Sequence, residues 1–307
     1  MRNIADEPFT HLTGSEFGLA THYVPSRTIP SLMSNLAQYE NPSFAQIDCA
    51  IEELYNERQP DESSGKLTGA VRNALDSAFR HHSVEEIIDS LAMLSNSRDI
   101  QVSGWAKQTL DTLDMRSPTS LKVALEAIRR GKNMSLRDAL QMEMGIATAY
   151  CVSHTLVRLD VGIIISSFQS GASPDFHKGI GAVLIDRIKG RPEWSPERIE
   201  DVSPEILDRF FSDNSSYRSQ MPWLSLPDTR VDSINPMTFA LLPESKIVEL
   251  VRSSCQGGPV PLSRLLSDME SLIKEKLGTK EKIIDVIHRR CQVVDDQGTT
   301  IVAWKEQ

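Results

Sequence analysis

Helix start signals recur along the chain and constrain its fold more than any other feature. Ser83 opens the run Ser-Val-Glu-Glu, in which the side chains of Ser83 and Glu86 can each accept from the other's backbone amide. Ser117-Pro118 and Ser203-Pro204 each place a capping serine before a proline, whose fixed φ suits the first helical turn. Apolar residues follow at intervals of three to four, which is the spacing of one helix face. This pattern predicts a mostly α-helical protein.

The apolar residues after each start signal predict which face of the helix is buried. The predicted sets are Ile87, Ile88, Leu91 and Leu94 after Ser83; Leu121, Leu125 and Ile128 after Pro118, with a stop at Gly131; Leu136, Leu140 and Ala147 after Ser135 and Asp138; and Ile206, Leu207, Phe210 and Phe211 after Pro204.

The remaining pattern is also helical. Further helices are predicted over 42–55, 67–79, 243–251, 262–277 and 280–291, and we predict one strand, 299–304, after a turn at 295–298. Polar breaks fall near 59–65 and 211–227, and the second is the better domain boundary because Ser, Asn, Asp and Pro cluster there.

Composition and charge exclude several classes of function. The 307 residues carry a net charge of −9, so an acidic surface without a broad attraction for phosphate backbones is expected, and no direct nucleic-acid role. The four cysteines form no CxxC pair, which argues against a disulfide scaffold and a zinc site and favours a reducing compartment. No apolar run is long enough for a membrane span, and the first ten residues show no signal or leader pattern.

Isolated candidate residues indicate ordinary structural roles. We interpret His81 and His82 as a solvated helix start, since adjacent side chains point apart and no further metal ligand lies nearby. His22, between apolar and aromatic neighbours, is expected to be a hydrogen-bonded structural histidine, and Glu143 part of an ordinary helix face. The run Gly179-Ile180-Gly181 lacks the preceding strand and third glycine of a dinucleotide loop, and no Gly-x-Ser-x-Gly nucleophile motif is present.

Three segments, in order, resemble the 3-hydroxyisobutyryl-CoA hydrolase branch of the crotonase superfamily. They are Leu12-Thr13-Gly14 with Gly18-Leu19-Ala20-Thr21-His22-Tyr23-Val24; Ser117-Pro118-Thr119-Ser120-Leu121-Lys122; and Asp175-Phe176-His177-Lys178-Gly179 running on to Pro192-Glu193-Trp194-Ser195-Pro196. The resemblance covers roughly residues 12–226, and the tail more loosely resembles an extension of fungal members. It implies that the chain is the C-terminal helical part of a crotonase-like α/β fold, with the β-rich catalytic core largely missing.

The chain departs from the family pattern at several places. The linker after Leu-Thr-Gly is shorter than usual, Lys178 and Gly181 stand where the family usually has Glu and Arg, and 152–170 has no family counterpart. We hypothesise that 152–170 is translated intron, which a transcript containing these codons as ordinary coding sequence would exclude. The expected parts are 1–24 as a core remnant, 25–151 as a helical region, 152–170 as the insert, 171–226 as the end of the family core and 227–307 as a helical extension.

The family chemistry is thioester hydrolysis, which needs two converging backbone amides for the oxyanion and a carboxylate that either activates water or attacks the carbonyl itself. In the family these groups lie upstream of Leu-Thr-Gly, so no catalytic residue carries over to this chain, and we expect it to be inert by itself. Asp175, Phe176 and His177 are the expected substrate-binding residues, although Phe176 also fits core packing and Asp175 also fits a helix cap.

The resemblance leaves two functions open, besides a stand-alone helical interaction domain. One is hydrolysis of 3-hydroxyisobutyryl-CoA in mitochondrial valine breakdown, with the acyl-CoA as substrate and no metal or redox cofactor. The other is a structural role in the small subunit of the mitochondrial ribosome, which a related fungal branch resembles. The implied partners are an acyl-CoA, and either further copies of the chain or the mitochondrial ribosome. The implied location is mitochondrial.

Overall fold

The protein is mostly helical, and its contacts divide it into two units. A computed structural model describes residues 20–22, 24–54, 67–151, 157–159, 162–164, 171–225, 236–296 and 298–305. Unit 1 comprises Met1–Ile4 and Asp76–Ile234, and unit 2 comprises Ala5–Leu75 and Asn235–Gln307. Helix α4 (Gly69–Ala78) gives residues 69–75 to unit 2 and 76–78 to unit 1. None of the described helices combines the length and apolar character that a bilayer crossing requires.

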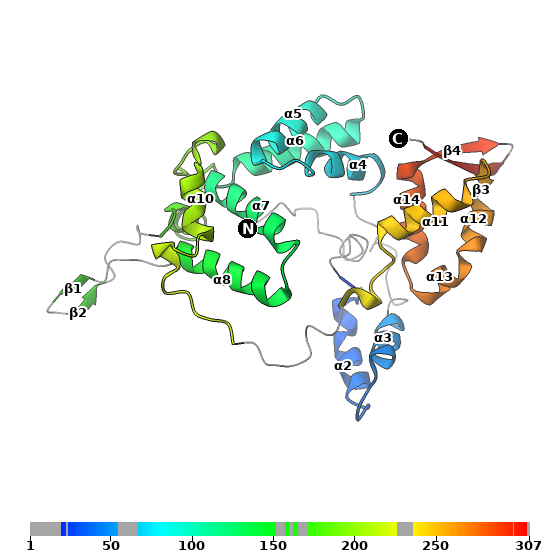
Figure 1. Ribbon diagram of the computed structural model, residues 1–307, viewed down its shortest axis with the longest axis horizontal. Helices are drawn as coiled ribbons and strands as arrows, with labels where there is room; N and C mark the ends of the chain where they lie inside the picture. The colour runs from blue at the N-terminus through cyan, green and yellow to red at the C-terminus, as the bar shows by residue number, and fades with distance from the viewer. Residues whose placement is uncertain are drawn as a thin grey trace. The chain divides into compact units, whose positions relative to one another are not determined.

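Unit 1 is built mainly from helices (Figure 1). Its helical elements are α5 (Val84–Leu94), α6 (Ile100–Asp114), α7 (Pro118–Gly131), α8 (Leu136–Cys151), α9 (Asp175–Ile180), the π-helix η3 (Gly181–Ile185), η4 (Ile199–Asp201), α10 (Pro204–Phe211) and η5 (Ser216–Arg218). The Ser83 capping box is present, and the Ser117 hydroxyl accepts from the Ser120 amide. The predicted caps at Ser83 and Ser117 are therefore confirmed, because a cap depends on residues only three positions apart. Ser203 holds the cap position of α10, but its side chain makes no capping hydrogen bond.

Two small cores hold unit 1. In the first core, Ile87 and Leu91 of α5 pack with Ala106 of α6. The second core joins α7, α8 and α10 through Val123, Ala127, Ile146, Ala149, Phe210 and Phe211. The predicted inward positions of α5 and α10 are confirmed.

The predicted face of α8 is wrong, and that of α7 is correct only in part, because Leu125 packs against the core of α5 and α6 whereas Ile128 faces outward. Ile128 is 70% exposed, while Val123 and Ala127 are buried. Leu136 and Leu140 are 55% and 41% exposed, whereas Gly145, Ile146 and Ala149 face inward. Small residues line this contact because α10 brings two phenylalanine rings against both helices.

The insert 152–170 contains regular structure that the sequence did not predict. Strands β1 (Val157–Leu159) and β2 (Gly162–Ile164) pair antiparallel, with Val157 opposite Ile164. The translated-intron hypothesis concerns the gene rather than the fold, and it stays a prediction.

Unit 2 combines helices with a three-stranded sheet. Its elements are η1 (Ser26–Thr28), α2 (Ile29–Leu36), α3 (Phe44–Glu52), η7 (Pro236–Phe239), α11 (Glu244–Ser254), β3 (Val260–Pro261), α12 (Leu262–Asp268), α13 (Glu270–Glu275), α14 (Thr279–Arg290), β4 (Cys291–Asp296) and β5 (Thr299–Trp304). The sheet is antiparallel in the order β3-β5-β4. Strand β5 and the turn at Gly298 are confirmed, and Gly298 has the positive φ of 84° that such a turn requires.

The prediction of a single strand was incomplete. Cys291 begins β4, which pairs with β5 from Cys291–Trp304 to Asp296–Thr299. The predicted helix over 262–277 is also divided, since α12 ends before the buried Met269 and α13 starts after it. The core of this unit gathers Ile247, Val251, Leu265, Ile283, Val286, Ile287 and Val302. The mostly helical fold class is confirmed, and the missing core stays a prediction.

Candidate functional site

Asp175, the first of the expected substrate-binding residues, opens α9 and is 2% exposed. Its Oδ2 accepts a 2.6 Å hydrogen bond from the Ser117 hydroxyl, and its Oδ1 accepts a 2.8 Å bond from the Ser195 amide. Pro174 rather than Asp175 holds the cap position of α9. Both carboxylate oxygens therefore accept structural hydrogen bonds, which connect α9 to the start of α7 and to the backbone at Ser195.

Phe176 and His177 lie on the more accessible side of α9. The Phe176 ring is 39% exposed, with its centroid 6.2 Å from that of Tyr150 and 5.5 Å from that of His177. Phe176 is thus packed on one side only. The structure places all three expected residues on one short helix, and their binding of a substrate stays a prediction. Lys178 donates a 2.7 Å bond to the carbonyl of Glu193.

Tyr150 stands behind this helix in the core. Its ring lies 4.6 Å from the ring of Phe210, and its hydroxyl is 3.0 Å from the Ser120 hydroxyl. Burial, and to a smaller extent the Asp175 charge, raise the pKa of Tyr150 to about 12, against the Ser120 hydrogen bond, which lowers it. The Tyr150 phenol is accordingly neutral at physiological pH and serves as a packing group.

A cavity of about 550 Å³ opens beside α5, α6 and α7 in unit 1. Its lining combines apolar side chains with arginines, among them Leu110, Leu121, Ile199, Arg116, Arg191 and Arg198. Arg191 already donates to the carbonyls of Asp114 and Glu197, at 2.7 and 2.6 Å. No local sequence pattern indicated this cavity, because its walls come from four separate segments.

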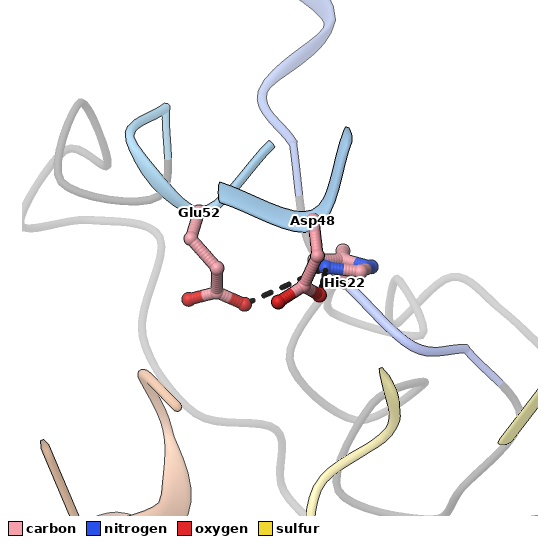
Figure 2. A group of neighbouring side chains, drawn as sticks. All are labelled: His22, Asp48 and Glu52. Carbon is pink, nitrogen blue, oxygen red and sulfur yellow. Dashed lines mark hydrogen bonds and ion pairs between the residues drawn. The ribbon is translucent and has the colours of Figure 1, made fainter. Parts of the chain in front are cut away.

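The clearest cluster of titratable groups lies in unit 2, around His22. Figure 2 shows His22 pointing toward Asp48 and Glu52, two residues of α3 that lie one helical turn apart. His22 Nε2 is 2.6 Å from Asp48 Oδ1 and 3.6 Å from Glu52 Oε1. His22 Nδ1 is 2.9 Å from Thr21 Oγ1. These contacts confirm that His22 is hydrogen-bonded.

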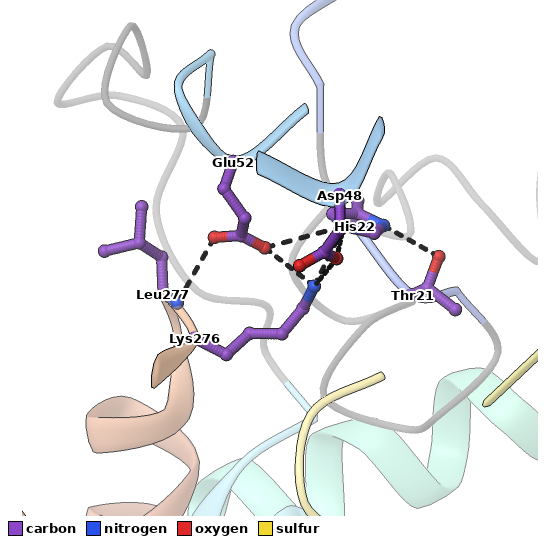
Figure 3. A network of polar contacts seen from close by, with 6 residues as sticks. All are labelled: Thr21, His22, Asp48, Glu52, Lys276 and Leu277. Atoms are coloured by element: carbon purple, nitrogen blue, oxygen red, sulfur yellow. Dashed lines mark hydrogen bonds and ion pairs between the residues drawn. The ribbon is translucent and has the colours of Figure 1, made fainter. Parts of the chain in front are cut away.

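Lys276, directly after α13, completes the cluster (Figure 3). Its Nζ lies 2.8 Å from His22 Nε2, from Asp48 Oδ1 and from Glu52 Oε1. Burial raises the pKa of Asp48, but hydrogen bonds and charge from Lys276 and His22 outweigh it, so the pKa is lowered overall. The exposed fractions of these four side chains run from 12% to 23%.

Sequence reasoning missed Asp48, Glu52 and Lys276. The spacing of Asp48 and Glu52, four residues apart on a predicted helix, was a usable signal that both carboxylates share a face. Nothing local connects them to Lys276, which is more than 220 residues away in sequence.

Comparison with known proteins gives the family. A model described as enoyl-CoA hydratase/isomerase matches residues 11–211, which is well over half of the chain. The chain belongs to the enoyl-CoA hydratase/isomerase family. The resemblance on which the sequence analysis rested is thereby confirmed at the level of this family.

Curated relatives of this enoyl-CoA hydratase/isomerase family member fall under two names. The small ribosomal subunit protein mS47 of Neurospora crassa is 27% identical over 94% of this chain and 53% of its own length. The mitochondrial 3-hydroxyisobutyryl-CoA hydrolase of Xenopus tropicalis is 29% identical over 64% of this chain and 43% of its own length. A mitochondrial 3-hydroxyisobutyryl-CoA hydrolase-like protein of Arabidopsis thaliana is 31% identical over 65% of this chain and 45% of its own length. The chain therefore spans about half the length of the relatives it matches.

Solved structures also match the chain. The carnitinyl-CoA dehydratase of Mycobacterium thermoresistibile matches with a TM-score of 0.44 and 22% identity, over 66% of this chain and 48% of that chain. A likeness of this size adds nothing to the family assignment.

Proposed function

We propose that this chain serves as a structural component of the small subunit of the mitochondrial ribosome. The observation that carries this proposal is the extent of the alignment with mS47, which covers 94% of the chain, against 64% for the Xenopus tropicalis hydrolase. An alignment of that extent includes most of 236–305, the stretch that supplies α11–α14 and the sheet of unit 2. A mitochondrial location follows from the same proposal.

The geometry of unit 1 favours binding through a surface. The buried Asp175 has both oxygens occupied by structural hydrogen bonds, as a packing residue does. Five exposed apolar residues occur between the end of α9 and position 188, namely Ile180, Val183, Leu184, Ile185 and Ile188, with exposed fractions from 38% to 74%. Exposed apolar side chains, where they gather into a patch, are typical of protein–protein contacts.

Sedimentation tests the ribosomal proposal. The tagged protein, expressed in its native mitochondria, is expected to sediment with the small subunit on a sucrose gradient and to remain there through a moderate-salt wash. Leu184→Asp with Ile185→Asp should reduce the bound fraction at least fivefold, whereas Ile100→Asp, at an 87% exposed position of the same unit, should not. A wild-type protein found wholly at the top of the gradient contradicts the proposal.

A second candidate function is hydrolysis of 3-hydroxyisobutyryl-CoA to 3-hydroxyisobutyrate and CoA. It is supported by the several relatives named as this hydrolase, at 27–29% identity over 63–65% of the chain. In this proposal the described helices form part of the site, and Asp175, Phe176 and His177 lie at the acyl-CoA. The oxyanion amides and the activating carboxylate belong to other parts of the whole protein.

Thiol release tests the second candidate. The whole protein, incubated with 3-hydroxyisobutyryl-CoA and a thiol reagent, is expected to turn over, and the 307-residue chain alone is expected to stay at background. Turnover by the chain alone contradicts the expectation that it is inert. A whole protein that sediments with ribosomes and releases no thiol leaves only the structural role.

A further inference from the structure

We propose that His22, Asp48 and Glu52 form a binding site for a divalent transition-metal ion of the Zn²⁺ class, in which the metal takes the place of the Lys276 ammonium group. All four residues belong to unit 2. Their ligand atoms, one from each of His22, Asp48 and Glu52, all lie within 4.8 Å of one another. The site is independent of the ribosomal and hydrolase proposals.

The three side chains converge on one cation position. Lys276 Nζ lies 2.8 Å from an atom of each, so a positive group already stands at the apex of a three-ligand tripod (Figure 3). Glu52 is further held by its Oε2, which accepts a 3.3 Å bond from the Leu277 amide. The tripod is thus a formed cation site rather than a chance grouping of acids.

Hydrogen positions in the cluster favour a metal over the ammonium. His22 Nε2 lies 2.6 Å from Asp48 Oδ1 and 2.8 Å from Lys276 Nζ. If Nε2 carries a proton it can donate to Asp48, but it then faces the ammonium donors. If Nε2 is a bare lone pair it can accept from Lys276, but it then faces a carboxylate oxygen at 2.6 Å. A metal ion removes this conflict, because each ligand then presents only lone pairs.

The ligand chemistry and charge point to the same class of ion. One imidazole nitrogen and two carboxylate oxygens are ligands of zinc and its neighbours, whereas calcium and magnesium prefer oxygen alone. The second ring nitrogen of His22 contacts the Thr21 hydroxyl, which is the kind of outer contact that fixes a ligating ring. A dication in place of the ammonium balances the two carboxylates of Asp48 and Glu52.

Modest side-chain movements convert the cluster into a metal site. Zn²⁺ bonds of about 2.1 Å require each ligand to move inward by about 0.7 Å from its present distance to the ammonium nitrogen. Such bonds also place tetrahedral ligand atoms about 3.4 Å apart. The 3.6 Å between His22 and Glu52 is close to that value, and the 2.6 Å between His22 and Asp48 must open. Asp48 and Glu52 lie one helical turn apart on α3, so their carboxylates can approach one ion by side-chain rotation.

Lys276 provides the sharpest test, because an ion-pair cluster and a metal site respond to its removal in opposite ways. The purified full chain is titrated with ZnCl2 by calorimetry, and separately with CoCl2, whose visible spectrum distinguishes nitrogen and oxygen ligands from thiolates. Wild-type protein is expected to bind one Zn²⁺ at micromolar concentrations. Lys276→Met should bind at least tenfold more tightly, since the competing ammonium is gone, while Lys246→Met, which removes an exposed pair with Glu249, should not.

Three further variants separate ligands from bystanders. His22→Gln and Asp48→Asn should each weaken Zn²⁺ binding at least tenfold in the Lys276→Met background, with circular dichroism spectra unchanged. Cys49→Ser, at the exposed position next to Asp48 on α3, should bind like its parent. Absence of Zn²⁺ binding by both the wild-type and the Lys276→Met proteins overturns the proposal, as does binding that survives in His22→Gln and Asp48→Asn.

Discussion

The hydroxyl of Ser117 donates a 2.6 Å hydrogen bond to Oδ2 of Asp175, joining the start of α7 to the start of α9. Ser117 also caps α7, and Oδ1 of Asp175 accepts from the Ser195 amide. Asp175→Ala leaves two donors without partners in a buried place and should lower the free energy of unfolding by about 2–4 kcal/mol. Urea unfolding followed by circular dichroism measures this loss.

Asp213→Ala is the matched control for that change. The Asp213 side chain is 99% exposed, and its ion pair with Arg218 is open to solvent. Its removal should leave the urea midpoint where it is in the wild type. Equal stability of Asp175→Ala and wild type would show that the hydrogen bond between Ser117 and Asp175 adds nothing to the free energy of unfolding.

Glu244 should make unit 2 less stable as the pH falls into the acid range. Burial raises the pKa of this carboxyl, but hydrogen bonds and charge from Arg289 and Arg290 outweigh it and hold the pKa at about 2. A carboxyl with a depressed folded pKa stabilises the fold above its ordinary value of 4.5, and this contribution is lost as the pH falls toward 2. Glu244→Gln should cost about 2 kcal/mol at pH 7 and little at pH 2.

The measurement is a series of unfolding curves between pH 7 and pH 2. The difference between wild type and Glu244→Gln should shrink steadily below pH 4.5. Glu249→Gln, which alters an exposed pair with Lys246, serves as the control and should follow the wild type at every pH. A constant gap between wild type and Glu244→Gln across the series contradicts the expectation.

Phe210 and Ile128 test the corrected inner face of unit 1. Phe210 is fully buried between α7 and α8, and Ile128 is 70% exposed although the sequence placed it inward. Phe210→Ala should lower the free energy of unfolding by about 3–5 kcal/mol, and Ile128→Ala by about 0.5 kcal/mol or less. Thermal unfolding of the two variants measures both losses. Similar losses would support the sequence-based prediction that Ile128 faces inward.

The four cysteines should divide into two classes of reactivity. Burial raises the pKa of the Cys255 thiol and raises that of Cys291 to about 11, whereas Cys49 and Cys151 are exposed. Since the thiolate is the reactive form, iodoacetamide at pH 8 should label Cys49 and Cys151 within minutes. Cys255 and Cys291 should be labelled only in urea, and peptide mass spectrometry locates the label.

Local sequence determined the helix starts of this protein. The capping box at Ser83 and the cap at Ser117 were predictable because each depends on side chains and amides within one turn. Strand β5 was predictable because the glycine after Asp295 and Asp296 marks a turn. The family could also be recognised, since its motifs are contiguous runs of residues.

Tertiary structure alone decided which helix faces are buried and which charged groups meet. Ile128 and Val123 are both apolar residues of α7, and only the rings brought by α10 make the second one the buried residue. His22, Asp48 and Lys276 lie on three segments that are far apart in sequence, so their meeting depends on the path of the chain through unit 2. The local sequence pattern carries information about residues within one helical turn. It does not indicate which distant residue will pack against them in the folded chain.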